Sequence, residues 1–267
     1  MYKTLQNTSR LRAIKKEDLR VFEFPGIADL PDVQHGIFSR EGGYSRGAYN
    51  SLNVSFGVGD SEEAVVNNRK RISGYFKNGQ LVFARQVHGK EVRVVHRSPG
   101  CREKKHFCDA GTGDAMVTNI PGINLVIQIA DCQAVMIYDP EKRVVANAHA
   151  GWRGNIQNII GYTFKIMKEQ FNSVPADVRV GISPSLGPCC AEFVNYQKEF
   201  PESLWRYKDE THHFDLWALS HDQLCEEGVL PKNISISGLC TKCNSDTFFS
   251  YRAQKETGRF AAVIGMT

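Results

Sequence analysis

Residues 130–154, with the sequence ADCQAVMIYDPEKRVVANAHAGWRG, place two apolar runs on either side of an Asp-Pro pair. The first run is AVMIYD (134–139) and the second is RVVANAHA (143–150). Asp139 ends the first run and Pro140 follows it. These two residue types are favoured at the first two positions of a type I turn. The sequence therefore predicts a β-hairpin here, and the register of this hairpin decides which of its side chains can meet.

Further strand-like runs, most of them rich in Val and Ile, recur along the chain at irregular spacing. Helical patterns separate them only in places, so a doubly wound parallel sheet fits poorly. We expect the α/β class, with a single-domain sandwich of mixed sheets. The other predicted strands are QLVFARQV (80–87), EVRVVH (91–96), GINLVIQIA (122–130), DVRVGIS (177–183) and FAAVIG (260–265).

Three segments have the apolar spacing of helices. The clearest covers residues 155–171, with Asn155 as its expected N-cap. The other two cover 61–76, capped by Ser61, and 216–227, capped by Asp215.

No repeat, low-complexity tract or linker divides the chain of 267 residues. We expect an N-terminal extension (1–20) followed by one catalytic domain (21–267). The net charge of +4 comes from 33 Lys and Arg against 29 Asp and Glu, spread along the sequence, which predicts no nucleic-acid partner but suits a small anionic substrate. The sequence shows no apolar run of membrane length and no signal peptide, so we expect a cytoplasmic protein without a membrane partner.

The hairpin predicts a metal site. If Asp139 pairs with Lys142, opposed residue numbers sum to 281, and Cys132 then faces His149. Opposed residues share a face with Cβ atoms about 4.5 to 5.5 Å apart, which lets a thiolate and an imidazole bind one zinc ion. The alternative explanation is a buried cysteine beside structural histidines.

A third ligand has to come from elsewhere. His88 in RQVHGKE is the best candidate because it ends a strand at a glycine turn, and His35 in QHGIFSREGG is the second choice. Three protein ligands leave one coordination position open, as in catalytic zinc sites.

Other segments offer candidate substrate-binding residues. HAGWRGN places Arg153 at the start of a helix, where backbone N–H groups attract an anion, although a tight turn with an exposed arginine explains it equally well. SREGGYSRGAYNSLN (39–53) carries Arg40, Ser45 and Arg46, which can line an oxyanion pocket, and GTGDAMVTN (111–119) carries Asp114. A structural role is the favoured interpretation of both glycine-rich segments.

The CTKC segment (240–243) has the spacing of half a structural zinc site. No second CxxC pair completes it, and the adjacent Cys189 and Cys190 are not expected to chelate together. We therefore expect no catalytic role for these cysteines, and we expect the thiols of this chain to be reduced.

Several segments together resemble the YfiH-type laccase-domain family. They are FSREGGYSRGAYNSLNVSFGVGD, RQVHGKEV, GDAMVTN, ADCQAVMIYDP, HAGWRG, SPSLGPCC, CTKCNSDTFFSYRA and TGRFAAVI. The resemblance implies a mixed-sheet fold like the catalytic domain of cytotoxic necrotising factor. It also implies one zinc or copper ion held by His88, Cys132 and His149.

Members of that family were first described as polyphenol oxidases and later as purine nucleoside phosphorylases with adenosine deaminase activity. This chain has 8 histidines and no HxH pair, which argues against a multicopper electron relay. It departs from the family pattern where Ala191, Glu192 and Phe193 replace a Tyr-Glu-Val segment, and where Gln133 and Ala134 replace Leu-Pro beside the metal ligand.

The leading hypothesis is a zinc-dependent purine nucleoside phosphorylase. It would convert adenosine, inosine or methylthioadenosine and phosphate to the base and the sugar 1-phosphate, with adenosine deaminase as a second activity. Arg153 and Arg40 are the candidate phosphate ligands, and Asp114 and Asp131 are candidate proton carriers or partners of a ligating histidine.

Three alternatives remain open. One, which the family resemblance also implies, is an amide hydrolase that removes misincorporated serine from cell-wall precursors, either with metal-dependent chemistry or with Cys132 as nucleophile and His149 as its base. The second is a copper polyphenol oxidase. The third is a non-catalytic binding module in which the metal closes the fold.

Overall fold

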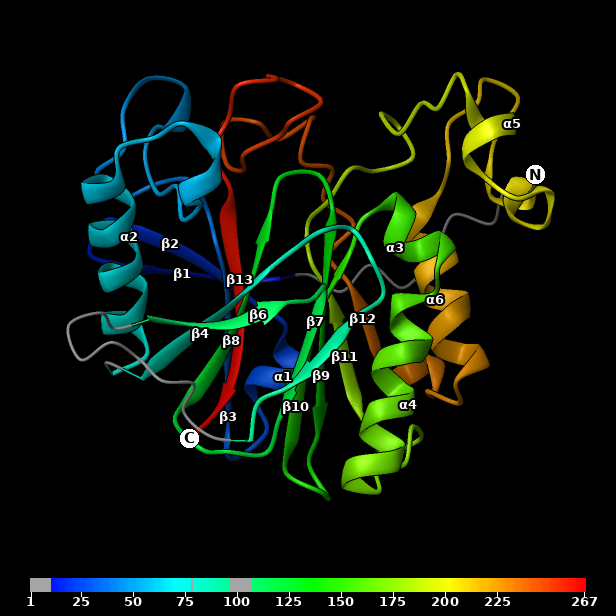
Figure 1. Cartoon of the computed structure of the whole chain (residues 1–267), viewed down its shortest axis with the longest axis horizontal. Coiled ribbons are helices and arrows are strands. Elements are labelled where there is room, and N and C mark those ends of the chain that lie inside the picture. The colour runs from blue at the N-terminus through cyan, green and yellow to red at the C-terminus, as the bar shows by residue number, and fades with distance from the viewer. Residues whose placement is uncertain (1–10, 78, 97–106) are drawn as a thin grey trace.

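The computed structural model describes residues 11–77, 79–96 and 107–267. Two β-sheets pack face to face, and helices cover the outer face of each, as Figure 1 shows. The architecture is mixed α/β with two mixed sheets. It confirms the predicted fold class and the preference for mixed over parallel sheets.

The first sheet has seven strands, in the spatial order β1-β2-β3-β13-β8-β4-β6. Strand β4 pairs in parallel with β6 and β8, and the remaining pairs are antiparallel. The strands are β1 (Arg12–Lys16), β2 (Leu19–Glu23), β3 (Val33–Phe38), β13 (Phe260–Met266), β8 (Ile123–Ile129), β4 (Gln80–Arg85) and β6 (Phe107–Thr112).

The second sheet has six strands, in the order β12-β11-β9-β10-β7-β5. Its parallel pairs are β11 with β12 and β5 with β7, while β9 and β10 form the antiparallel hairpin at its centre. The strands are β12 (Ile234–Ile236), β11 (Arg179–Ile182), β9 (Gln133–Asp139), β10 (Val144–Ala150), β7 (Ala115–Thr118) and β5 (Val92–Val94).

Helix α2 (Glu62–Tyr75) packs on the seven-stranded sheet, and α4 (Ile159–Phe171) and α6 (Leu216–Glu226) pack on the six-stranded sheet. Shorter α-helices and 3-10 turns lie in the connections. They are α1 (Pro25–Ala28), α3 (Trp152–Ile156), α5 (Tyr196–Glu199), Gly47–Tyr49, Phe56–Val58, Glu202–Tyr207 and Pro231–Asn233.

The core lies in three layers because each sheet is covered on both faces. Met136 and Tyr138 belong to the cluster between the sheets, whereas Phe164 of α4 packs on the outer face of the six-stranded sheet and Ile72 of α2 on that of the seven-stranded sheet. Every residue of β9 and β10 is buried. This burial explains why their sequences are apolar without the alternation of a half-exposed strand.

Two predicted helices are confirmed together with their caps. The Ser61 hydroxyl accepts the Ala64 N–H at 3.4 Å, and the Asp215 carboxylate accepts the Ala218 N–H at 2.9 Å. The single helix predicted for 155–171 is wrong at its start, because α3 ends at Ile156 and α4 begins at Ile159. Asn158, in the left-handed region with φ of 56°, caps α4 by accepting the Gly161 N–H at 2.9 Å.

The predicted hairpin exists, but its register differs by two residues. Asp139 pairs with Val144, and His149 therefore faces Ala134 instead of Cys132. The Asp139 side chain accepts the N–H groups of both Glu141 and Lys142, and Arg143 takes a left-handed φ of 52°. These bonds build a four-residue loop where the sequence suggested a two-residue turn.

The N-terminal boundary predicted at residue 21 falls inside β2, and β1 pairs with β2 along its whole length. Residues 1–10 of the predicted extension lie outside the described residues. No helix in the described ranges is both long enough and apolar enough to cross a bilayer.

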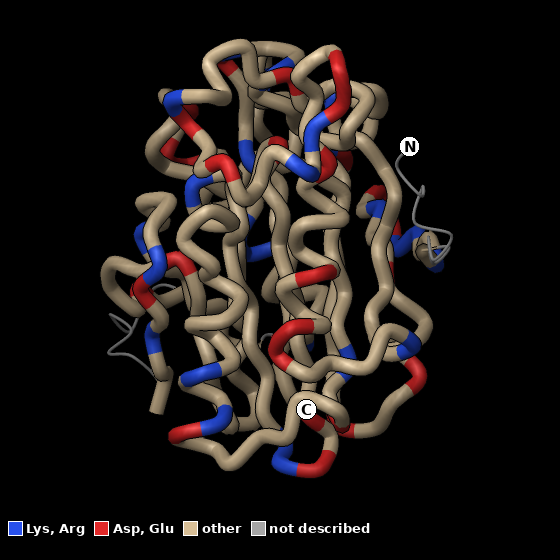
Figure 2. Tube along the Cα trace, turned by 90° about the vertical axis from the view of Figure 1, so that its right-hand side faces the viewer, with Lys and Arg blue, Asp and Glu red and all other residues tan. Residues whose placement is uncertain are grey.

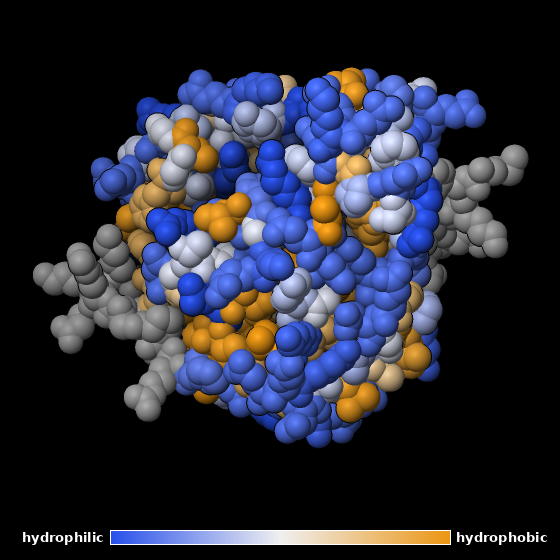
Figure 3. Space-filling view, turned by 45° about the vertical axis from the view of Figure 1, so that its right-hand side comes forward, coloured by the Kyte–Doolittle hydropathy of each residue, from blue (hydrophilic) through white to orange (hydrophobic). Residues whose placement is uncertain are grey.

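Charges of both signs are interspersed on the surface. Figure 2 shows Lys and Arg among Asp and Glu over the face in view. The face in Figure 3 is mostly hydrophilic, with apolar residues in small separate groups.

Candidate metal centre

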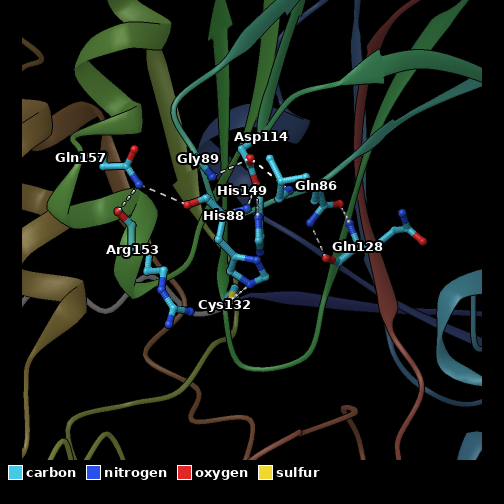
Figure 4. Close-up of polar contacts among 10 residues, drawn as sticks. Gln86, His88, Gly89, Asp114, Gln128, Cys132, His149, Arg153 and Gln157 are labelled. Atoms are coloured by element: carbon cyan, nitrogen blue, oxygen red, sulfur yellow. Dashed lines mark hydrogen bonds and ion pairs between the residues drawn. The ribbon is translucent and has the colours of Figure 1, made fainter. Parts of the chain in front are cut away.

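The structure brings His88, Cys132 and His149 together (Figure 4). His88 lies in the connection after β4, Cys132 directly before β9, and His149 near the end of β10. One ligand atom from each lies within 4.8 Å of the others, and Cys132 Sγ is 3.9 Å from His88 Nε2. His149 is buried and His88 is exposed, so this His2Cys group can hold a metal ion with one side toward solvent.

Asp114 positions two of the three residues. Its Oδ1 lies 2.9 Å from His149 Nδ1 and accepts the His88 N–H at 2.8 Å. Its Oδ2 accepts the N–H groups of Val87 and Gly89 at 3.1 and 2.8 Å. The carboxylate thus engages Nδ1 of His149 and leaves Nε2 to face Cys132.

These contacts leave no free oxygen on Asp114 for the predicted hydrogen bond to substrate. Its side chain is fully buried, and its two oxygens are occupied by four donors. The alternative prediction, a partner of a ligating histidine, matches its contacts.

The backbone around His88 is held in an uncommon conformation. His88 has φ of 61°, in the left-handed region that residues with a Cβ rarely adopt. Beside it, Gln86 Nε2 donates to the Gln128 carbonyl at 2.9 Å, and the Gln128 N–H donates to Gln86 Oε1 at 2.9 Å. This pair of bonds ties the end of β4 to β8 and fixes the start of the His88 loop. No pattern in the sequence singled out either glutamine.

Gly151 lets the chain pass close to the metal centre. A Cβ at this position would lie 2.8 Å from Cys132 Sγ and 3.1 Å from His88 Cδ2. Only glycine fits without displacing both side chains. Close packing against Cys132 and His88 therefore requires glycine at position 151.

Asp131 anchors Cys132 from its other side. Asp131 has φ of 88°, and its Oδ1 accepts the hydroxyls of Thr241 and Ser250 at 2.6 and 2.7 Å. Its Oδ2 accepts the Arg252 N–H at 2.6 Å. These contacts tie the residue before Cys132 to the 241–252 segment, and the predicted proton transfer by Asp131 stays a prediction.

The charges of the centre favour a thiolate. Burial alone would raise the pKa of the Cys132 thiol, but interactions with His149 and His88 lower it below its usual range. For His149, burial lowers the pKa, while Cys132 and Asp114 raise it, and the raising interactions prevail. A deprotonated sulfur next to an imidazole is the state that binds a metal cation.

A shallow, open surface hollow of about 410 Å³ lies next to the centre, and His88, Cys132 and His149 are not among its lining residues. Gln157 connects the two, because its Nε2 donates to the His88 carbonyl at 3.3 Å (Figure 4). The exposed Arg153 stacks on Trp152, with 4.2 Å from Cζ to the ring centre. The lining residues are Trp152, Arg153, Ile156, Gln157, Lys198 and Glu199.

Arg40 and Ser45 do not join this centre through any described contact. Arg40 Nε and Nη1 donate to the carbonyls of Asn50 and Ser245 at 2.8 and 2.7 Å. Ser45 is buried and donates to Asp60 at 2.6 Å. These contacts stabilise loops. They agree with the structural role that the sequence analysis favoured for residues 39–53. Arg46 is exposed.

Sequence reasoning missed Arg259 as a candidate site residue. Burial lowers its pKa, while the charges of Cys132 and Asp131 act in the opposite direction, so its guanidinium lies within electrostatic reach of the centre. Its Nη1 donates to the carbonyls of Thr257 and Gly258. The only signal was its place in TGRFAAVI, a segment used for the resemblance alone.

Gln133, one of the departures from the family pattern, anchors the start of β9. It is buried, its Nε2 donates to the Leu216 carbonyl at 2.8 Å, and its Oε1 accepts the Ser220 hydroxyl at 2.5 Å. This polar residue therefore ties the strand after Cys132 to α6.

A second group of possible metal ligands was excluded by the sequence analysis and is present in the structure. Cys189, Cys190, Cys240 and Cys243 have their sulfurs within 4.8 Å of one another. Cys189 and Cys190, which were not expected to chelate together, thus both lie where they could share one metal ion with the cysteines of the CTKC segment. These four, Cys132 and Cys225 are free thiols, whereas Cys108 is disulfide-bonded, contrary to the expectation of reduced thiols throughout.

Comparison with known proteins places this chain in a family. The family model described as multi-copper polyphenol oxidoreductase laccase matches residues 34–267. Purine nucleoside phosphorylase YlmD of Geobacillus stearothermophilus is 32% identical over 243 residues, covering 86% of this chain and 89% of the relative. Purine nucleoside phosphorylase YfiH of Escherichia coli is 30% identical over 238 residues, covering 85% and 90%. The crystal structure of YlmD from Geobacillus stearothermophilus superposes with a TM-score of 0.82 at 29% identity, covering 95% of this chain and 97% of the other.

Proposed function

Because this chain belongs to the multi-copper polyphenol oxidoreductase laccase family, we propose that it is a zinc-dependent purine nucleoside phosphorylase with adenosine deaminase as a second activity. The supporting observation is the His2Cys group, open on the His88 side and adjacent to a cavity that carries Arg153. Both family relatives named above are purine nucleoside phosphorylases.

The donor set suits zinc. His149 presents Nε2 because Asp114 engages Nδ1, and the lowered pKa of Cys132 favours the thiolate that zinc binds. His88, Cys132 and His149 would hold the ion and leave a fourth position for substrate. When bound, zinc supplies a Lewis acid, the chemistry that deamination of adenosine requires.

Phosphorolysis needs an anion site close to the sugar. An oxygen of orthophosphate attacks C1′ of the ribose, the bond from C1′ to the purine nitrogen breaks, and its electron pair leaves with the base, which takes a proton. Arg153 and Lys198 bring two positive charges to the hollow next to the centre, against the one carboxylate of Glu199. Arg153 is thus the proposed phosphate ligand, whereas the bonds of Arg40 to backbone carbonyls argue against the same role for it.

One observation favours a second candidate, the amide hydrolase. Without a metal, Cys132 and His149 form a close thiolate and imidazolium pair, which is the arrangement of a nucleophilic cysteine and its base. A thiol of this kind is alkylated rapidly when free and is protected when bound to zinc.

The deciding experiment measures free base released from inosine and adenosine, with and without phosphate. The variant Cys132→Ala removes a proposed ligand, and Cys225→Ala is the control because Cys225 is a free thiol of α6. We expect phosphate-dependent release by the wild type and the control, and none by Cys132→Ala. Absence of release by wild type that contains zinc would contradict the proposal and favour the hydrolase.

A further inference from the structure

The geometry points to a second metal site that is separate from the proposed active centre. We propose that Cys189, Cys190, Cys240 and Cys243 bind a structural zinc ion as four thiolates. Cys243 Sγ lies 3.6 Å from the sulfurs of both Cys189 and Cys190, and all four sulfurs lie within 4.8 Å of one another.

The distances suit a shared ion better than a covalent bond. Zinc–sulfur bonds of about 2.3 Å in a tetrahedron place neighbouring sulfurs about 3.8 Å apart, whereas the sulfurs of a disulfide are about 2.05 Å apart. In addition, one sulfur, that of Cys243, has two equal neighbours at 3.6 Å. A disulfide would use one of them and leave the convergence of the other two cysteines unexplained.

The fold explains how segments about 50 residues apart meet. Strands β11 and β12 are parallel neighbours, so the chain leaves both at the same edge of the sheet. The pairing continues past the strands as an isolated parallel bridge between Ser185 and Cys240. The two loops then carry one Cys-Cys pair and one Cys-x-x-Cys pair to the same point.

The four cysteines differ in exposure: Cys240 is buried and Cys190 is half-buried, whereas Cys189 and Cys243 are exposed. A zinc ion with four thiolates retains a double negative charge. Arg252, which donates to the carbonyls of Cys190 and Glu192, brings a positive charge to the same loop.

The site would also position the active centre. Thr241, which lies between two of the cysteines, donates its hydroxyl to Asp131, the residue before Cys132. The Leu186 N–H, from the other loop, donates to the Asp131 carbonyl at 2.8 Å. Both loops joined by the proposed zinc therefore hold the backbone that carries Cys132.

The test is metal stoichiometry, measured by native mass spectrometry and elemental analysis on full-length protein produced with added zinc. We expect two equivalents per chain in the wild type and one in Cys243→Ser and in His149→Ala, which each remove one site. Cys225→Ser is the matched control and should retain both. Cobalt substitution of His149→Ala should give the intense sulfur-to-metal charge-transfer absorption of a tetrathiolate site.

This test does not depend on the proposed activity, because metal content is read out without substrate. If Cys243→Ser does not fold, the exposed Cys189 offers a second variant, Cys189→Ser, and the zinc that stays bound to His149→Ala reports on the four-cysteine group alone. A single equivalent that disappears in His149→Ala would overturn the proposal. So would a disulfide among the four cysteines in intact protein purified without oxidant.

Discussion

The carboxylate of Asp114 lies 2.9 Å from Nδ1 of His149 and at the same time accepts the backbone N–H of His88 at 2.8 Å. One fully buried side chain thus orients two proposed metal ligands that are 61 residues apart in sequence. A buried carboxylate is stable only when its oxygens accept hydrogen bonds or face a cation. The conformation of the His88 loop is therefore coupled to the position of His149 in β10.

Asp114→Asn should weaken zinc binding about 10- to 100-fold, the usual cost of losing a partner of a ligating histidine. The amide keeps one acceptor oxygen but directs an NH2 group at an N–H donor. Competition against a chelator of known affinity measures the change. Asp177→Asn, at an exposed position, is the control and should bind zinc as the wild type does. Equal affinity in all three proteins would show that Asp114 does not position the ligands.

Gly151→Ala should abolish stoichiometric zinc binding at the His2Cys group. The added methyl would lie 2.8 Å from Cys132 Sγ, which forces that ligand or the start of α3 to move. Gly74→Ala is the matched control, because a Cβ there meets nothing within 4 Å and alanine favours a helix. Zinc content after gel filtration, with circular dichroism to verify folding, provides the comparison. Full zinc content in Gly151→Ala would refute the close-packing argument.

His35 should make the protein less stable as pH falls. Burial, helped by the charge of Arg12, lowers its pKa to about 4, below the value of about 6.5 in an unfolded chain. The neutral ring fits this site, since Nε2 accepts the Phe24 N–H at 2.8 Å. Between these two values the unfolded chain binds the extra proton. The free energy of unfolding therefore decreases as pH falls from about 6.5 to 4, by about 3 kcal/mol in total.

Urea unfolding of the wild type and His35→Gln at several pH values isolates this contribution. The variant is expected to lose stability at pH 7 and to show the smaller decrease toward pH 4. Parallel pH curves for the two proteins would mean that His35 does not titrate in this range.

The sequence predicted that Cys132 and His149 lie close together, although the predicted hairpin register was wrong. The register differs by two residues, and a shift of two preserves which face each side chain occupies, so Cys132 and His149 still meet. A shift of one residue would have separated them. What fixed the register was the Asp139 side chain bonding to Glu141 and Lys142, a local competition between turn types that periodicity does not resolve.

The four-cysteine group shows what the sequence could not provide. Spacing rules look for two chelating pairs of the same kind, but here a parallel strand pair brings Cys190 and Cys240 together. Arg40 and Arg153 were equal candidates for the phosphate ligand on sequence grounds. Only the tertiary contacts show that the guanidinium of Arg40 donates to backbone carbonyls. Residues that depend on nonlocal pairing were therefore the ones missed or misassigned.

Arg153 and Arg40 can be separated by kinetics. Arg153→Ala should raise the KM for phosphate about tenfold or more, because a charge-assisted hydrogen bond contributes about 1.5 to 3 kcal/mol. Arg40→Ala should lower the thermal midpoint and leave that KM unchanged, since its guanidinium bonds join loops through Asn50 and Ser245. Initial rates at varied phosphate and saturating inosine provide both values. A raised KM for phosphate in Arg40→Ala, with none in Arg153→Ala, would move the anion site from the cavity beside α3 to the 39–53 loop.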